Sequence, residues 1–128
     1  MQGTVTDDHH FVAARPSVER IKRAVAEIDH DRSHSVDTID AYLIYEIAFD
    51  GGGEVTFHFR GEELVKVRQI LGLSWGRVSD EYYFQDDTLM FHRECEELFP
   101  ITTDGSGLDH SRLVTSFVGT HYVWTWQQ

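Results

Sequence analysis

Residues 79–96 read SDEYYFQDDTLMFHRECE, and this stretch decides the fold because it has the pattern of one tight β-hairpin. Two runs rich in aromatic and branched residues flank Asp86-Asp87, and aspartate tolerates the backbone angles of a two-residue turn. A turn at this pair fixes the register of both strands. The predicted opposed pairs are Phe84–Leu89, Tyr82–Phe91, Asp80–Arg93 and Val78–Cys95 on one face, and Tyr83–Met90 and Glu81–His92 on the other.

A fainter copy of this hairpin lies 25 residues upstream. Gly61-Glu62 stands at its turn, and the corresponding apolar positions are Phe57, Phe59 and Leu64 for Tyr82, Phe84 and Leu89. Two hairpins in series indicate an antiparallel meander rather than a βαβ fold. Internal duplication and convergence on the same hairpin chemistry both explain the similarity.

An amphipathic helix is predicted before the hairpins. Ser17 is a suitable N-cap, and apolar residues recur after it at helical spacing. They are Val18, Ile21, Ala24, Val25 and Ile28. We expect residues 1–15 to be a flexible tail, the helix to end near Asp31, and residues 16–128 to form a single domain.

Three further segments complete the predicted sheet. Residues 39–49 alternate in the manner of a central strand, with Ile39, Ala41, Leu43, Tyr45, Ile47 and Phe49 on one face. Residues 62–71 fit either a short helix or a strand, and the parallel with the second hairpin favours a strand. Residues 113–126 predict the last strand, with a bulge at Gly119.

The fold class is therefore α+β, an N-terminal helix packed on a five- or six-stranded antiparallel meander sheet. The expected core is Val18, Ile21, Val25, Ile28, Leu43, Tyr45, Ile47, Val55, Phe57, Phe59, Tyr82, Phe84, Leu89, Phe91, Val118 and Tyr122. The single cysteine, Cys95, excludes an internal disulfide and is expected beside Val78 as a small apolar residue.

The net charge is −11, from 22 acidic against 11 basic residues. A field of this sign repels nucleic acid and anionic membranes and speeds encounter with a basic protein. Solubility, or adaptation to a salty cytoplasm, is the alternative explanation. No apolar run is long enough for a membrane span or a leader, so we expect no membrane insertion. The localisation is the periplasm or cell envelope if a leader was removed, and otherwise the cytoplasm.

Three patterns resemble chemical sites, and each has a simpler explanation. His30 and His34 have the spacing of zinc ligands on a helix, but their neighbours look like a linker. Asp104 begins a loop with part of a calcium-ligand pattern, which an ordinary turn explains. Glu81 opposite His92 suits a carboxylate orienting a general base, and also an ordinary cross-strand pair. We therefore assign no metal, cofactor or catalytic residue.

Residues 53–96 carry the text GEVTFHF…EELVKV…WGRVSDEYYFQDDTLMFHRE. This text resembles a pattern of small uncharacterised bacterial envelope proteins, in which an EYYF-like strand end is followed by a short turn and an L-x-F return strand. The resemblance implies an N-terminal helix followed by an antiparallel β-meander, and export to the periplasm or surface. It carries no catalytic residues.

The functional expectation is a non-catalytic acidic binding module for a basic protein partner, in concrete terms a bacterial immunity or inhibitor protein. The expected partner-binding residues are Glu81, Glu94, Glu96, Glu97, Asp104, Trp124 and Trp126, the last two as aromatic anchors. One alternative is a small-molecule- or metal-binding envelope protein. Another is a small hydrolase-type enzyme that uses His58 or His92. The sequence leaves the oligomeric state open.

Overall fold

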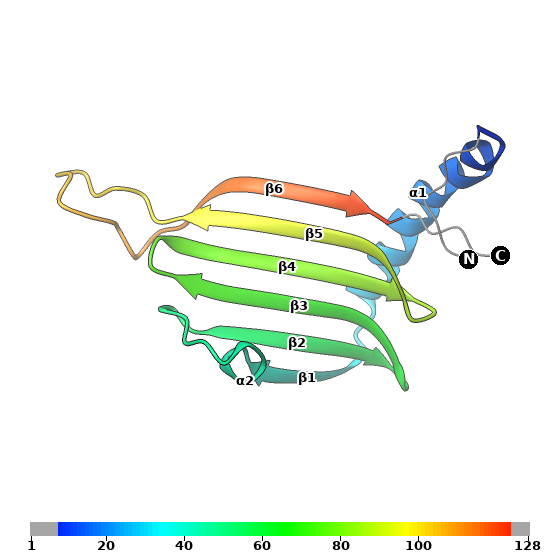
Figure 1. Ribbon diagram of the computed structural model, residues 1–128, viewed down its shortest axis with the longest axis horizontal. Helices are drawn as coiled ribbons and strands as arrows, with labels where there is room; N and C mark the ends of the chain where they lie inside the picture. Colours follow the sequence, from blue (N-terminus) through cyan, green and yellow to red (C-terminus); the bar gives the residue numbers. More distant parts are fainter. Residues whose placement is uncertain (1–7, 124–128) are drawn as a thin grey trace.

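The computed structural model describes the backbone of residues 8–123 and the side chains of residues 18–123 (Figure 1). One long helix precedes a six-stranded antiparallel sheet, in which every strand lies beside the strand before it in the sequence. The elements are α1 (Asp8–His30), β1 (Ser35–Asp40), α2 (Tyr42–Tyr45), β2 (Gly53–Arg60), β3 (Glu63–Leu73), β4 (Gly76–Gln85), β5 (Thr88–Leu98) and β6 (Val114–Tyr122). The α+β meander expected from the sequence is confirmed, and the ambiguous segment 62–71 belongs to a strand.

Helix α1 begins at Asp8 and ends at His30, close to the expected end. The segment expected to be a flexible tail therefore overlaps the helix from residue 8 onwards, and Ser17, the expected N-cap, lies inside the helix. Apolar residues at helical spacing form the buried stripe of α1, as expected. They are Ile21, Val25 and Ile28.

The β4–β5 hairpin turns at the expected pair of aspartates. Asp86 and Asp87 have φ angles of 51° and 62°, as a type I′ turn requires, and Phe84 pairs with Leu89. Beyond that pair an extra residue, Met90, shifts the register by one. The other five predicted pairs are therefore wrong, and Cys95 lies opposite Ser79. The observed pairs are Tyr83–Phe91, Tyr82–His92, Glu81–Arg93, Asp80–Glu94, Ser79–Cys95 and Val78–Glu96.

The β2–β3 hairpin has its bulge in the equivalent position. Val65 is the extra residue there, 25 positions before Met90, and Gly61 in the turn has a φ of 64°. Both bulge residues are buried. The likeness between the hairpins thus extends from turn and strand pattern to the place where the pairing is interrupted.

The predicted central strand over residues 39–49 is wrong. Strand β1 ends at Asp40, whose carboxylate accepts a hydrogen bond from the backbone N–H of Tyr42 and starts the short helix α2. Ala41 is fully buried, whereas Leu43 and Ile47 are 71% and 59% exposed and do not belong to the core. The alternating pattern therefore fits a turn of helix whose apolar side chains point outward.

The loop before β2 contacts the end of the neighbouring strand β3. Gly51 donates a backbone hydrogen bond to Gly72, and a Cβ on Gly72 would lie 2.6 Å from the Gly51 Cα. Only glycine fits this close approach.

Strand β6 is shorter than expected, and its bulge is at a different residue. Ser116 is the extra residue between the pairs Glu96–Phe117 and Glu97–Thr115, so the predicted bulge at Gly119 is wrong. Val118, expected in the core, is 56% exposed. Trp124 and Trp126 lie outside the described residues.

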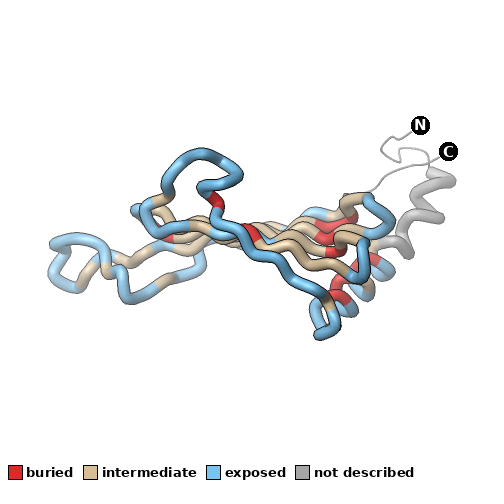
Figure 2. The backbone as a smooth tube through the Cα atoms, turned by 90° about the horizontal axis from the view of Figure 1, so that it is seen from below, coloured by how far each residue is buried: buried red, intermediate tan, exposed pale blue. Residues whose placement is uncertain are grey.

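The main core forms where α1 meets the sheet, and Figure 2 shows many of the buried residues on this side, with α2 on the opposite side. Val65, Tyr83 and Met90 are buried here although they were not in the expected core, because that core was placed on the side of Tyr82 and Phe84. The bulge at Met90 also brings Phe91 onto the helix side. The cluster comprises Ile21, Val25, Ile28, Val65, Tyr83, Met90 and Phe91. We call the side of the sheet that faces α1 the helix face, and the other side the open face.

Candidate binding face

The open face is built from rows of directly opposed residues that cross the sheet. Side chains alternate along a strand, and opposed residues in neighbouring strands point to the same side. The first row is Asp37, Phe57, Val67, Tyr82, His92 and His121; the second is Ile39, Val55, Gln69, Asp80, Glu94 and Gly119; the third is Gly53, Leu71, Val78, Glu96 and Phe117.

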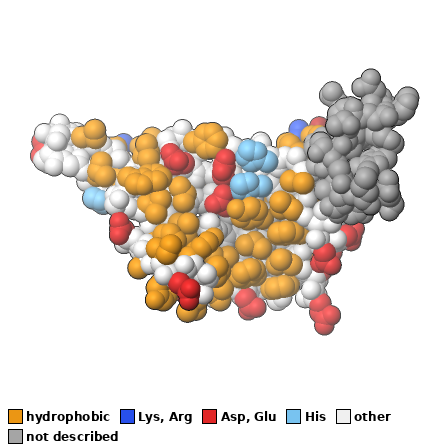
Figure 3. Space-filling view, in the orientation of Figure 1, with side chains coloured by type: hydrophobic (Ala, Val, Ile, Leu, Met, Phe, Trp, Pro, Cys, Tyr) orange, Lys and Arg blue, Asp and Glu red, His pale blue; other side chains and the backbone are white. Residues whose placement is uncertain are grey.

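This face is largely apolar and partly exposed. Figure 3 shows hydrophobic side chains over much of it, with acidic groups and two adjacent histidines among them. Phe57, Phe59 and Tyr82 were expected in the core, yet they are only half-buried here. Among the described residues only the α2 segment packs over this side, where the Tyr45 hydroxyl donates a hydrogen bond to Gln69. Most of the apolar surface therefore remains in contact with solvent.

The α2 segment adds a second exposed apolar surface beside the open face. Tyr42, Leu43, Ile44 and Ile47 are each more than two-fifths exposed. Contiguous apolar exposure of this kind marks interaction surfaces more often than isolated exposed residues do.

Charge is sorted between the two faces of the sheet. Every lysine and arginine of the six strands lies on the helix face: Arg60, Lys66, Arg68, Arg77 and Arg93. There they pair with acidic side chains of α1, its following loop and the sheet. The charged residues of the open-face rows are all acidic: Asp37, Asp80, Glu94 and Glu96.

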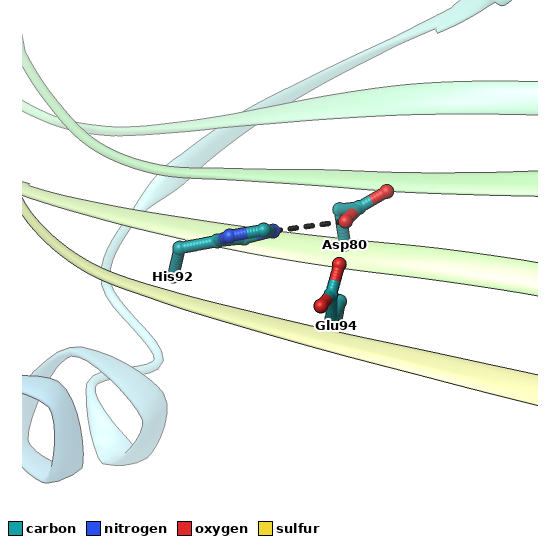
Figure 4. Close-up of side chains that lie close together, drawn as sticks. All are labelled: Asp80, His92 and Glu94. Carbon is teal, nitrogen blue, oxygen red and sulfur yellow. Dashed lines mark hydrogen bonds and ion pairs between the residues drawn. The ribbon is translucent and has the colours of Figure 1, made fainter. Parts of the chain in front are cut away.

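A polar cluster lies where β4, β5 and β6 cross the open face, formed by Asp80, His92, Glu94 and His121. His92 Nε2 lies 2.9 Å from Asp80 Oδ1 (Figure 4), and His121 Nε2 lies 3.3 Å from Glu94 Oε1. The two imidazole rings stack with centroids 5.3 Å apart. Carboxylate and imidazole donors converging in this way are the ligand types of a metal site.

Tyr82 borders the cluster and stacks on His92. The two rings are parallel within 2°, with centroids 4.5 Å apart. Burial, followed by the charge of Asp80, raises the pKa of the Tyr82 phenol. The phenol therefore stays neutral at physiological pH and borders the cluster on one side.

The expected pair of Glu81 and His92 is wrong, because the bulge at Met90 puts them on opposite faces. Asp80 is the carboxylate beside His92, and Glu81 instead lies in the helix–sheet interface. There its carboxylate accepts from Arg93 Nε at 2.9 Å and lies 3.2 Å from Lys66 Nζ. Burial opposes ionisation of Glu81, but these two cations outweigh it and lower its pKa.

Asp29 of α1 joins the same interface network. It accepts hydrogen bonds from the Tyr83 hydroxyl at 2.7 Å and from Lys66 Nζ at 2.9 Å. Burial opposes ionisation of Asp29, but both bonds lower its pKa. Burial and the bond to Asp29 raise the pKa of Tyr83 to about 12. Glu81 therefore belongs to the network that holds α1 on the sheet.

Among the other expected partner-binding residues that the structure describes, only Glu94 and Glu96 share a face. Glu94 and Glu96 lie on the open face, while Glu97 is on the helix face and pairs with Arg77 at 2.7 Å. Asp104 lies in the loop between β5 and β6, which extends beyond one end of the sheet (Figure 1). Hydrogen bonds from Thr102 and Ser106 lower the Asp104 pKa to about 2, so a turn explains this residue.

The histidines of the suggested zinc pair have separate surroundings. Helix α1 ends at His30, whose ring contacts the Ala26 carbonyl, so His34 is not one turn further on the same helix. His34 and His58 line a hollow of about 310 Å³ beside Lys66. Burial and the charge of Lys66 lower the pKa of His58.

Comparison of the chain with known protein families, curated proteins and solved structures gave no match. Within residues 8–123, no helix combines the length and the apolar character needed to cross a membrane. The candidate site therefore rests on the geometry of the open face.

Proposed function

We propose that the protein is a non-catalytic binding module whose open face docks a basic protein partner. The observation that carries this proposal is the sorting of charge: apolar and acidic side chains share the open face, while every strand cation lies on the other side. Such a face complements a surface with apolar residues at its centre and lysine or arginine around them.

A second copy of the chain is a poorer occupant of this face. Docking two open faces together sets Asp80, Glu94 and Glu96 of one copy near those of the other, without a strand lysine or arginine on either side. Like charges that face each other in a desolvated interface weaken binding by roughly several kcal/mol. The net charge of −11 opposes self-association further and speeds encounter with a basic protein.

The concrete form of the proposal is an immunity or inhibitor protein, which binds its basic target tightly and performs no chemistry on it. The exposed apolar side chains of the α2 segment extend the docking surface along the edge of the sheet. Of the acidic residues expected from the sequence, Glu94 and Glu96 belong to this surface. The proposal also keeps Trp124 and Trp126 as the aromatic anchors expected from the sequence.

The test uses two neighbouring residues of β6 that point to opposite faces. Phe117 and Val118 are 50% and 56% exposed, and Phe117 is on the open face. A pull-down from the native host identifies the partner, and its affinity is then measured for Phe117→Lys and for the control Val118→Lys. Both variants add one positive charge to the same strand.

We expect a basic partner that binds Phe117→Lys at least about tenfold more weakly than the parent chain, a loss of about 1.4 kcal/mol, and binds Val118→Lys as the parent does. Recovery of acidic partners only, or of none, contradicts the proposal. Equal weakening by both variants does so too, as does a stable dimer of the parent chain that Phe117→Lys dissociates.

A further inference from the structure

We propose that the polar cluster of Asp80, His92, Glu94 and His121 binds one divalent transition-metal ion of the zinc type. The ion would lie at the centre of the open face. Its ligands would come from two neighbouring pairs, Asp80 with His92 and Glu94 with His121. This inference goes beyond partner docking and is tested on the isolated chain, so the two proposals can fail separately.

The first argument is the spacing of the donor atoms. Ligand atoms of Asp80, His92 and Glu94 all lie within 4.8 Å of one another, and His121 Nε2 is 3.3 Å from Glu94 Oε1. Zinc–ligand bonds of about 2.0–2.2 Å place tetrahedral ligand atoms about 3.3–3.6 Å apart. The spacing of the Asp80, His92 and Glu94 atoms thus approaches that of ligands to one ion, and His121, beside Glu94, is the candidate for the fourth ligand.

The second argument is electrostatic. Asp80 and Glu94 are directly opposed across β4 and β5, and like charges in that position destabilise a sheet. On the helix face, by contrast, Glu81 stands between Arg68 and Arg93 in the corresponding row. The row of Asp80 and Glu94 has no lysine or arginine on the described strands, and a divalent cation supplies the missing positive charge.

The third argument is that the neighbours of the cluster hold its side chains in place. A Cβ on Gly119 would lie 2.9 Å from Glu94 Oε1, so glycine at this position leaves room for the carboxylate. On the other side the Tyr82 ring lies parallel to His92 and fixes the plane of its imidazole. Side chains held by rigid strands and stacked rings form a better site than side chains on loops.

The donor set selects the class of metal. Two imidazoles with two carboxylates suit Zn²⁺ and its first-row neighbours, whereas Ca²⁺ and Mg²⁺ prefer oxygen ligands alone. Zn²⁺ and Co²⁺ are therefore the probes, with Ca²⁺ as the control ion.

The experiment uses the full chain without an affinity tag, stripped of metal by a chelator and then dialysed. Titration calorimetry with Zn²⁺ should give one equivalent bound per chain, with a Kd of about 10 μM or below. Co²⁺ should produce the visible absorption bands of a four-coordinate site, and Ca²⁺ at the same concentration should give no binding heat.

The variants His92→Ala and His121→Ala should each weaken Zn²⁺ binding at least about tenfold. Glu94→Gln, which preserves the shape of the side chain, should do the same. The matched control is the double variant His9→Ala with His10→Ala, which removes the adjacent histidines near the N-terminus and should leave the affinity unchanged. The urea midpoint of each metal-free variant establishes that it is folded.

Three results would overturn the proposal. One is the absence of stoichiometric Zn²⁺ binding by the parent chain. Another is binding that survives in a folded His92→Ala or His121→Ala variant with its affinity intact. The last is binding that disappears in the His9/His10 double variant, because the metal would then be held near the N-terminus.

Discussion

Tyr83 and Tyr82 are neighbours in β4 that face opposite sides of the sheet, and replacing each by phenylalanine tests the division into two faces. The Tyr83 ring is fully buried, and its hydroxyl donates to Asp29 at 2.7 Å and accepts from Arg93 at 3.0 Å. Phenylalanine keeps the ring and its contact with Lys66 Nζ, which lies 5.0 Å from the centroid. The substitution therefore removes the hydroxyl alone.

The expected cost follows from these two bonds. A hydrogen bond to a charged group contributes about 1.5–3 kcal/mol, and the bond to the Asp29 carboxylate is of this kind. The bond from Arg93 counts for less, because the guanidinium keeps its pairing with Glu81. We expect Tyr83→Phe to lower the free energy of unfolding by about 2 kcal/mol. For a chain of this size the Tm then falls by roughly 6–10 °C.

The control is Tyr82→Phe, whose ring lies on the open face against His92. It should change the free energy of unfolding by less than about 0.5 kcal/mol, as most substitutions at partly exposed positions do. Urea denaturation followed by circular dichroism measures both variants. Tyr83→Phe in an Asp29→Asn background completes a double-mutant cycle, and the coupling should exceed about 0.5 kcal/mol. Equal losses for the two tyrosines, or a coupling near zero, would refute the assigned faces and the Asp29–Tyr83 bond.

Two further predictions concern pH and the bulge. The pKa values of Asp29 and Glu81 are lowered in the folded state, so their contribution to stability is complete above their unfolded-state pKa values near pH 4–5. This contribution is lost as the pH falls through the folded-state pKa values. Urea midpoints measured from pH 7 to pH 3 should therefore decline, and those of Asp29→Asn should decline less. Met90→Ala should lower the free energy of unfolding by about 2–5 kcal/mol, and Leu89→Ala, on the half-buried other side, by less than half as much; equal losses in thermal unfolding would contradict the bulge.

The positions of the two hairpin turns could be predicted from the sequence because a two-residue turn accepts few residue types. Asp86-Asp87 and Gly61-Glu62 supply residues that accept positive φ between runs with strand character, so both hairpins and the meander followed. The helix stripe was equally legible, since Ile21, Val25 and Ile28 recur at the spacing of α-helical turns.

The bulges could not be predicted from the sequence, and most of the predicted register of the β4–β5 hairpin was therefore wrong. Met90 and Phe91 are both apolar and both face α1, so nothing in a period-two pattern marks the extra residue. Every pair beyond the bulge was therefore displaced by one position. The same displacement hid the candidate site, because it placed His92 opposite Glu81 instead of beside Asp80 and Glu94.

The α2 segment was misread for a different reason. Residues 39–49 alternate in hydrophobicity, and an isolated alternating run does not distinguish a strand from a helical turn that leaves its apolar side chains exposed. Asp40 was the available signal, since its carboxylate caps the N–H of Tyr42 two residues on. The exposure of Leu43 and Ile47 depends on which side of the sheet remains uncovered, and that is a property of the assembled fold.

The order of the strands also determines how the chain can fold while it is being made. Each strand pairs with the strand made just before it, so the sheet can grow one hairpin at a time. Helix α1 is synthesised before the sheet, but the surface it packs on, which includes Tyr83, Met90 and Phe91, is complete only when β5 has been made. Helix α1 therefore docks only after almost the whole sheet has been made.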